Sequence, residues 1–148
     1  MVQQMKISDG VTATDLAWLA GLLDGDGHIG ARLDIHGNGH GRPVIRTTIQ
    51  IAMTHEPTID HTCSLFGGSK FHRTYQDNLP VKRNHRDVWE WRAGQLQHQY
   101  DVLTGVYPYL ITKQECAKLV LAIVENKLSE SPDLMYQMEL AIQLKGLK

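Results

Sequence analysis

The chain has 148 residues, a formal net charge of −1 and 42% hydrophobic residues. This composition is typical of one globular domain with a substantial core. No stretch of the sequence approaches the roughly 18 to 20 apolar residues that are needed to cross a bilayer. The first ten residues lack a secretory signal pattern, and Cys63 and Cys116 form no C-x-x-C motif. We therefore expect a single domain over residues 1–148 in an intracellular protein of the cytoplasm or an organelle.

The first predicted element is a helix over residues 15–23 that is apolar on nearly all sides. Thr12 and Asp15 have the spacing of a capping box at its start. A helix of this kind is buried on more than one side. It ends in "LAGLLDGDG", residues 19–27, where Asp24 and Asp26 stand at the negative end of the helix dipole. Cations are favoured at that end of a helix, so two carboxylates there indicate either a bound cation or a functional role.

From His28 the apolar residues recur with a period of two, which predicts two strands around the turn-rich residues 36–43. One face of this hairpin is apolar and carries Ala31, Leu33, Ile35, Ile45, Ile49 and Ile51. The other face is polar and carries Arg32, Asp34, His36, Arg46, Thr48 and Gln50.

A short helix follows from Glu56-Pro57 to Gly67-Gly68, and residues 70–75 and 87–91 form a second strand pair around a loop at 77–85. Trp89 and Trp91 alternate on one face of this pair, as core residues do. Helices are expected over 93–104, 113–127 and 131–146. Thr112 and Glu115 would cap the second of these, and Ile142 would lie on the apolar side of the third. The order predicts an α+β domain with its helices gathered on one face of a sheet.

The stretch "LAGLLDGDG" resembles the signature of the LAGLIDADG homing endonucleases, and the element order over residues 14–128 resembles their αββαββα fold. The resemblance implies a saddle-shaped, antiparallel four-stranded DNA-binding sheet. It also implies an intron-encoded enzyme that makes double-strand breaks in a long pseudo-palindromic target by metal-dependent phosphodiester hydrolysis.

The same resemblance assigns the catalytic positions. Asp26 and the backbone carbonyl of Gly25 match the ligands of Mg²⁺ or Mn²⁺, and oxygen ligands suit such hard cations. Lys113 matches a lysine close to the scissile phosphate, and its position at the start of a helix opposes the local dipole. Asp24 is expected to do structural work, such as capping the partner helix.

With one motif in the chain, the resemblance implies a homodimer in which two copies of the first helix meet at a twofold axis. The predicted interface residues are Leu19, Ala20, Gly21, Leu22, Leu23 and Asp24.

The polar sheet face is the expected DNA-binding surface, because a two-stranded ribbon fits the major groove. The residues are those of the polar hairpin face, namely Arg32, Asp34, His36, Arg46, Thr48 and Gln50, with Lys70, Arg73 and Tyr75 beside them. Lys82, Arg83 and Arg86 in the loop are predicted phosphate contacts.

One departure concerns Met53, which stands where relatives carry a polar residue that can order water. A thioether cannot do this as an amide can, and Thr54 or His55 would have to substitute. Two alternatives therefore stay open: an RNA-binding maturase of the host intron, and a DNA-binding regulator that has lost catalysis.

Overall fold

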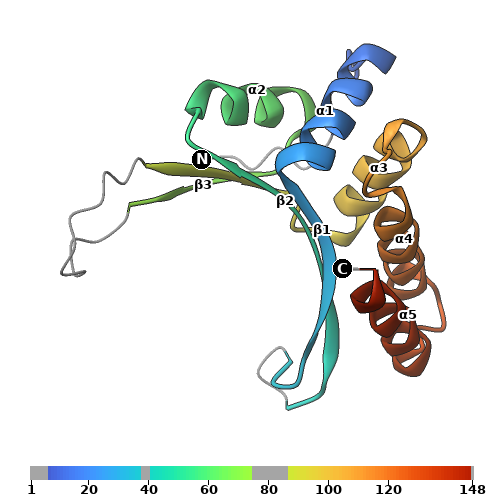
Figure 1. Ribbon diagram of the computed structural model, residues 1–148. Helices are drawn as coiled ribbons and strands as arrows, with labels where there is room; N and C mark the ends of the chain where they lie inside the picture. Colours follow the sequence, from blue (N-terminus) through green and yellow to red (C-terminus); the bar gives the residue numbers. More distant parts are fainter. Residues whose placement is uncertain (1–6, 38–40, 75–86, 148) are drawn as a thin grey trace.

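The computed structural model describes residues 7–37, 41–74 and 87–147. Helices and strands follow in the order α1 (Ala13–Asp26), β1 (Gly27–Asp34), β2 (Val44–Met53), α2 (Glu56–Phe66), β3 (Ser69–Arg73), β4 (Val88–Arg92), α3 (Leu96–Val106), the short 3-10 helix η1 (Tyr107–Tyr109), α4 (Gln114–Leu128) and α5 (Leu134–Gly146). The helices cover one face of a curved sheet and leave the other face open (Figure 1). The predicted α+β class, with helices on one face, is confirmed. None of the described helices is both long and apolar enough to cross a membrane.

The four strands pair antiparallel in the order β1-β2-β4-β3. Strands β1 and β2 pair from Gly27 opposite Ile51 to Asp34 opposite Val44. Strands β2 and β4 pair over a much shorter stretch, in which residues 50–53 lie opposite residues 89–92. The hairpins β1–β2 and β3–β4 therefore share a short seam and then diverge as the two arms of an arch (Figure 1). We call them the first arm and the second arm.

Helix α1 begins as the sequence predicts. The Thr12 hydroxyl accepts the backbone N–H of Asp15 at 3.2 Å, and the Asp15 carboxylate accepts the backbone N–H of Thr12 at 2.9 Å. The Thr12 backbone N–H, and secondarily the Thr12 hydroxyl, which also donates to the Asp15 carboxylate at 3.0 Å, hold the pKa of Asp15 below its ordinary value. At the other end, a Cβ on Gly27 would lie 2.7 Å from the Leu23 Cα, so only glycine lets the chain pass directly from α1 into β1.

The main core lies between the sheet and the helices. Trp91 is fully buried on the helix-facing side of β4, and its indole N–H donates to the Gly67 carbonyl at 2.6 Å. Gly68 follows with a φ of +93°, where a Cβ would lie 2.6 Å from the Arg92 carbonyl oxygen. Trp89 is partly buried against the same core, so the placement of both tryptophans on one core-facing side is confirmed.

Several local predictions are wrong. The predicted capping box of Thr112 and Glu115 does not form. Helix α4 begins after Lys113, whose side chain makes no capping hydrogen bond. Asp133 caps α5 instead, through the N–H groups of residues 135 and 136. Ile142 is 69% exposed on the outer side of α5, and Ile35, 60% exposed, follows the end of β1 near the tip of the first arm.

Candidate catalytic helix end and nucleic-acid interface

The two carboxylates at the end of α1 occupy different environments. Asp24 is half-buried, and its two carboxylate oxygens accept the backbone N–H groups of Ile111 and Lys113, each at 2.9 Å. Asp26 is the last residue of the helix and is exposed. Asp24 therefore binds the segment that leads into α4 of its own chain, while Asp26 is exposed.

The side chain of Lys113 supplies the cation that the end of α1 lacks in its own sequence. Its ammonium donates to the backbone carbonyls of Leu23 at 2.8 Å and Asp24 at 2.7 Å. These carbonyls belong to the last turn, which carries negative partial charge. The Leu23 carbonyl also accepts the backbone N–H of Gly27. Lys113 is therefore electrostatically unfavourable at the start of α4 but favourable at the end of α1, where its positive charge faces the negative end of the helix dipole.

The donor set at this helix end has the chemistry of a hard-cation site. Asp26 follows directly on Gly25, whose carbonyl lies in the last turn of the helix, where the helix itself supplies few donors. Within residues 7–37, 41–74 and 87–147, no three His, Cys, Asp or Glu side chains cluster as metal ligands. One chain therefore offers a carboxylate and a carbonyl, and a six-coordinate Mg²⁺ would take its remaining oxygen ligands from water, phosphate or a second chain.

The face of α1 that is open differs from the predicted interface. Leu19, Ala20 and Leu23 are fully buried in the core of their own chain, so their assignment to a dimer contact is wrong. The exposed residues along the helix are Ala13, Thr14, Ala17, Trp18, Gly21, Gly25 and Asp26. Leu22 is half-buried, and a Cβ on Gly21 or Gly25 would meet no atom within 4 Å. The fold of the single chain therefore does not require glycine at either position.

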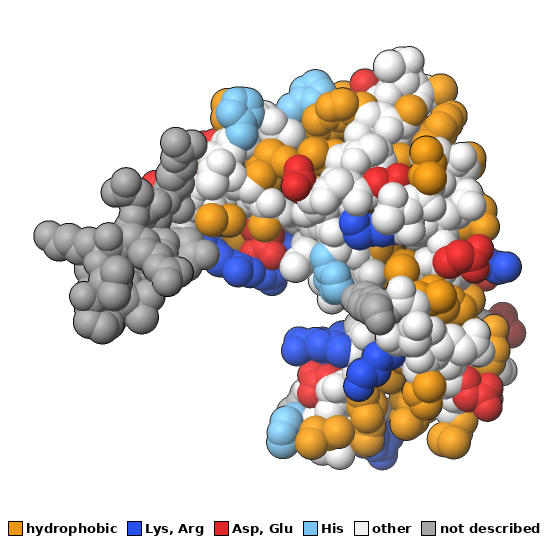
Figure 2. All heavy atoms as spheres, viewed as in Figure 1, with side chains coloured by type: hydrophobic (Ala, Val, Ile, Leu, Met, Phe, Trp, Pro, Cys, Tyr) orange, Lys and Arg blue, Asp and Glu red, His pale blue; other side chains and the backbone are white. Residues whose placement is uncertain are grey.

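Basic side chains gather on the open, concave side of the arch (Figure 2). The register places Arg32 opposite Arg46 and His28 opposite Gln50 on this side of the first arm. The Asp34 carboxylate accepts a hydrogen bond from the Arg46 Nε at 2.6 Å. This hydrogen bond holds the pKa of Asp34 below its ordinary value.

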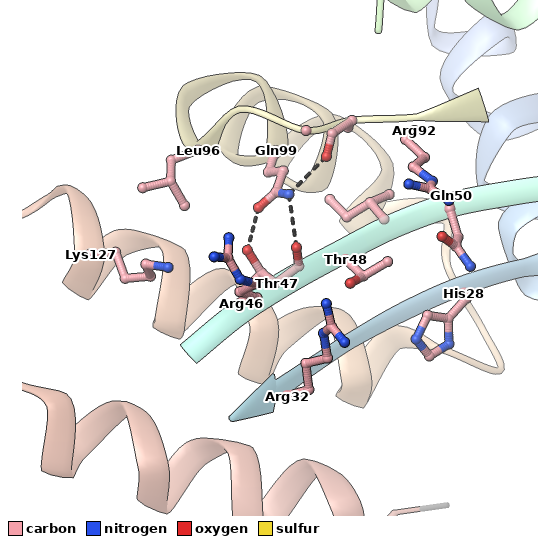
Figure 3. Close-up of a pocket in the computed structure, with 13 residues that line it drawn as sticks. His28, Arg32, Arg46, Thr47, Thr48, Gln50, Arg92, Leu96, Gln99 and Lys127 are labelled. Carbon is pink, nitrogen blue, oxygen red and sulfur yellow. Dashed lines mark hydrogen bonds between the residues drawn. The ribbon is translucent and has the colours of Figure 1, made fainter. Parts of the chain in front are cut away.

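A cavity of about 530 Å³ opens where β2 runs past the end of β4 (Figure 3). Of the described residues that line it, four are cationic and none is acidic: Arg32, Arg46, Arg92 and Lys127. Burial, and secondarily the charge of Arg46, lowers the pKa of Lys127. Gln99 of α3 closes one side, because its amide donates to the carbonyls of Ala93 at 2.8 Å and Thr47 at 3.2 Å and its oxygen accepts the Thr47 hydroxyl. The arrangement suits an anion such as a phosphate.

Solved structures of homing endonucleases share this architecture. I-CvuI, in complex with the I-CreI target in the presence of Mg, is 26% identical, with a TM-score of 0.71 over 91% of this chain and 82% of that one. The archaeal intron-encoded I-Vdi141I, complexed with DNA, is 11% identical, with a TM-score of 0.72 over 91% and 84%. The LAGLIDADG homing endonuclease I-LtrWI, bound to target DNA, is 13% identical, with a TM-score of 0.61 over 95% and 45%. At 11% and 13% identity, the last two show the fold alone.

The chain resembles I-CvuI in fold over nearly its whole length. This similarity agrees with the motif at residues 19–27 and with the geometry of the helix end described above. The chain has the fold of the LAGLIDADG homing endonucleases, which are its structural neighbours. No protein-family model matches the sequence, and no curated protein matches it.

Within this chain, the predicted DNA-binding residues do not all share one face. Arg73 lies on the concave side of β3, whereas Lys70 lies on the helix-facing side. The Lys70 ammonium bonds Glu56 at 2.7 Å and Asp60 at 2.6 Å, and its placement beside Arg73 is therefore wrong. His36 follows the end of β1, where its backbone N–H donates to Asp34. Four predicted residues lie outside the described residues: Tyr75, Lys82, Arg83 and Arg86.

Other polar residues of this chain lie on the concave side without having been predicted there. His28 and Arg92 lie there beside Gln50 at one end of the cavity (Figure 3). Side chains alternate between the two faces of a strand, so His28, four residues before Arg32, lies on the same face as Arg32. Arg92 pairs with Gln50 and therefore shares its face. Lys127 and Gln99 lie on helices, and no local pattern in the sequence indicates that they reach the sheet.

Proposed function

We propose that the protein is a site-specific DNA endonuclease that cuts both strands of a pseudo-palindromic target with the help of Mg²⁺ or Mn²⁺. The observation that carries the proposal is the contrast at the end of α1: Asp24 is engaged by its own chain, while Asp26 is exposed at a helix terminus beside Lys113. The motif alone is compatible with two structural carboxylates, but this geometry leaves one of them available for chemistry.

The residues at the helix end divide the work of hydrolysis. Asp26 and the Gly25 carbonyl would hold the divalent cation. When bound, such a cation positions water and stabilises charge on the oxygens of a phosphodiester. The Lys113 ammonium is fixed by two carbonyls at 2.7 and 2.8 Å, so its positive charge remains beside a phosphate without reorganisation. The two arms bind the DNA, with arginines directed to guanine and Gln50 to adenine.

Cutting both strands with one Asp26 per chain is best served by a C2 homodimer, in which the exposed α1 face packs against its copy. Gly21 has open space on this face, so Gly21→Gln leaves the fold of each chain intact while it separates the two helices. We expect this variant to sediment as a monomer at concentrations where the wild type and the Gly146→Gln control are dimers. Gly146 has equally open space on α5. A dimeric Gly21→Gln chain would contradict the α1 interface.

Met53 favours a second candidate, a DNA-binding regulator without catalysis. Its side chain packs against the core on the helix-facing side of β2. The neighbouring His55 ring bonds the Thr58 hydroxyl at 2.7 Å at the start of α2. Neither residue is arranged as a ready substitute for a water-ordering amide, so slow cleavage is expected.

A cleavage selection on randomised DNA with Mg²⁺ tests the proposal. The wild type should enrich cut sites with twofold symmetry. Asp26→Asn should abolish cutting while it keeps DNA binding, and the exposed Asp9→Asn should cut like the wild type. Binding without cutting in the wild type would favour the regulator. Binding of host-intron RNA in place of DNA would favour a maturase.

A further inference from the structure

The concave side of the second arm holds a buried carboxylate. Glu90 of β4 is 1% exposed, although its strand position faces the open side of the sheet. Its register neighbours are Phe71 on β3 and Ala52 on β2. Asp and Glu are almost never fully buried unless they are paired, so a carboxylate at the centre of this face calls for an explanation.

Two arginines converge on one oxygen of this carboxylate. Arg73 and Arg92 each donate from Nη2 to the Glu90 Oε2 at 3.0 Å. Arg92 is two residues along the same strand, and Arg73 is diagonally across on β3, so both lie on the face of Glu90. The Arg92 guanidinium also lies 4.6 Å from the centre of the Phe71 ring. Acidic, basic and apolar side chains indeed meet below the second arm (Figure 2).

The guanidinium groups stay accessible while the carboxylate does not. The side chains of Arg73 and Arg92 are 60% and 42% exposed, against 1% for Glu90. Among the described residues, the Glu90 Oε1 and the Arg92 Nε are buried without a hydrogen-bond partner. A cluster built only for stability would satisfy these atoms. This one instead uses a single oxygen to hold two planar donors whose side chains stay largely accessible to a ligand.

We propose that Glu90 is a positioning residue for DNA sequence recognition, which sets Arg73 and Arg92 to recognise adjacent guanines; this inference rests on the proposed function. Arginine recognises guanine through two parallel hydrogen bonds to O6 and N7, and this requires a fixed guanidinium plane. The Glu90 carboxylate supplies that constraint to both arginines and offsets their mutual repulsion. Glu90 itself touches no base.

The test is a binding selection on randomised duplex DNA without a divalent metal, so that the result is independent of catalysis. Glu90→Gln keeps the shape of the side chain but removes the charge. It should reduce the preference for guanine roughly tenfold at one block of positions in each half-site, since a good bidentate contact contributes about that much discrimination. Affinity for non-specific DNA should rise, because one negative charge is lost from the interface.

Two arginine variants identify which base positions in each half-site depend on Arg73 and Arg92. Arg73→Lys and Arg92→Lys retain the charge but lose the planar fork, so they should relax the same positions as Glu90→Gln. Asp34→Asn removes the carboxylate charge that Arg46 contacts on the first arm and should affect different positions. If Glu90→Gln does not fold, Glu90→Asp and the two exposed arginine variants carry the comparison.

The outcomes separate this inference from the proposed function. A wild-type motif that Glu90→Gln leaves unchanged, or weakens equally at all positions, would overturn the positioning role, since a structural carboxylate would act in this way. Relaxed positions that differ between Glu90→Gln and both arginine variants would also overturn it. A wild-type chain that selects no sequence would overturn the proposed function, and this inference with it.

Discussion

Lys113 and Asp24 hold each other through both main chain and side chain: the Lys113 backbone N–H donates to the Asp24 carboxylate at 2.9 Å, and the Lys113 ammonium donates to the Asp24 carbonyl at 2.7 Å. The end of α1 and the start of α4 are thereby fastened together across about 90 residues of sequence. The position of Asp26 depends on this fastening, because it is two residues further along the same helix.

Asp24→Asn should destabilise the protein, whereas Asp26→Asn should not. The amide can accept one of the two backbone N–H groups but presents its own NH₂ to the other. We expect a loss of about 2 kcal/mol for Asp24→Asn, as for hydrogen bonds to a charged group. Denaturant unfolding at one fixed protein concentration measures both variants. Equal stabilities of the two variants would contradict the assigned division of roles.

Lys113→Met should lower stability by about 1–2 kcal/mol, because it keeps the aliphatic stem and removes the donor to two helix-terminal carbonyls. Lys113→Arg should restore much of the loss, since it returns a cation to the same place. Thermal unfolding of the two variants measures the difference. Lys118→Met, at an exposed position of α4, is the matched control and should unfold like the wild type. A similar loss in the control would show that the contact with α1 is not the cause.

Gln99→Leu should cost about 2–4 kcal/mol, because it leaves the carbonyls of Thr47 and Ala93 without their amide donor in a buried site. Gln99→Glu should be worse, since a carboxylate would face two carbonyl oxygens. Amide hydrogen exchange should show faster opening around residues 93–99 than in α5. Gln143→Leu on the exposed side of α5 serves as the control. An unchanged Gln99→Leu protein would mean that water satisfies both carbonyls.

The stability difference between the wild type and Asp34→Asn should depend on pH. The Arg46 hydrogen bond holds the pKa of Asp34 below 3.8, its ordinary value. Because the pKa is lower in the folded state, the stabilisation is fully present above about pH 5 and is lost as the pH falls through the folded-state pKa. Thermal unfolding from pH 7 to pH 3 should show the two proteins converging at the acid end. In an Arg46→Gln background the gap should be small at every pH.

Local patterns predicted most of the fold. The period of two identified the first arm, turn signals around residues 77–85 identified the second, and the Thr12–Asp15 box predicted the start of α1. The face of α1 that is buried could not be predicted, because a helix that is apolar nearly all round does not reveal its direction. Lys70 illustrates an avoidable error, since its position differs in parity from that of Arg73 and the two cannot share a face of one regular strand.

The contacts that define the candidate site are mostly long-range. The cap at the start of α4 comes from Asp24, so the local Thr112–Glu115 spacing was misleading. The role of Lys113 at the α1 dipole and the reach of Gln99 to β2 likewise depend on helices that meet only in three dimensions. Asp26 was identified through its motif, and the structure adds that it is exposed while its neighbour Asp24 is not.

The short seam between β2 and β4 has a practical consequence for engineering. Among the described residues, Gln50–Met53 pair with Trp89–Arg92 and the Ala93 N–H donates to the Ile49 carbonyl at 3.0 Å. The described strand residues outside this seam therefore share no ladder between the two hairpins. Each hairpin can therefore be randomised as a separate cassette, and improved versions of the two can be recombined with additive effects. Changes within the seam itself would shift both cassettes at once and should be avoided in such libraries.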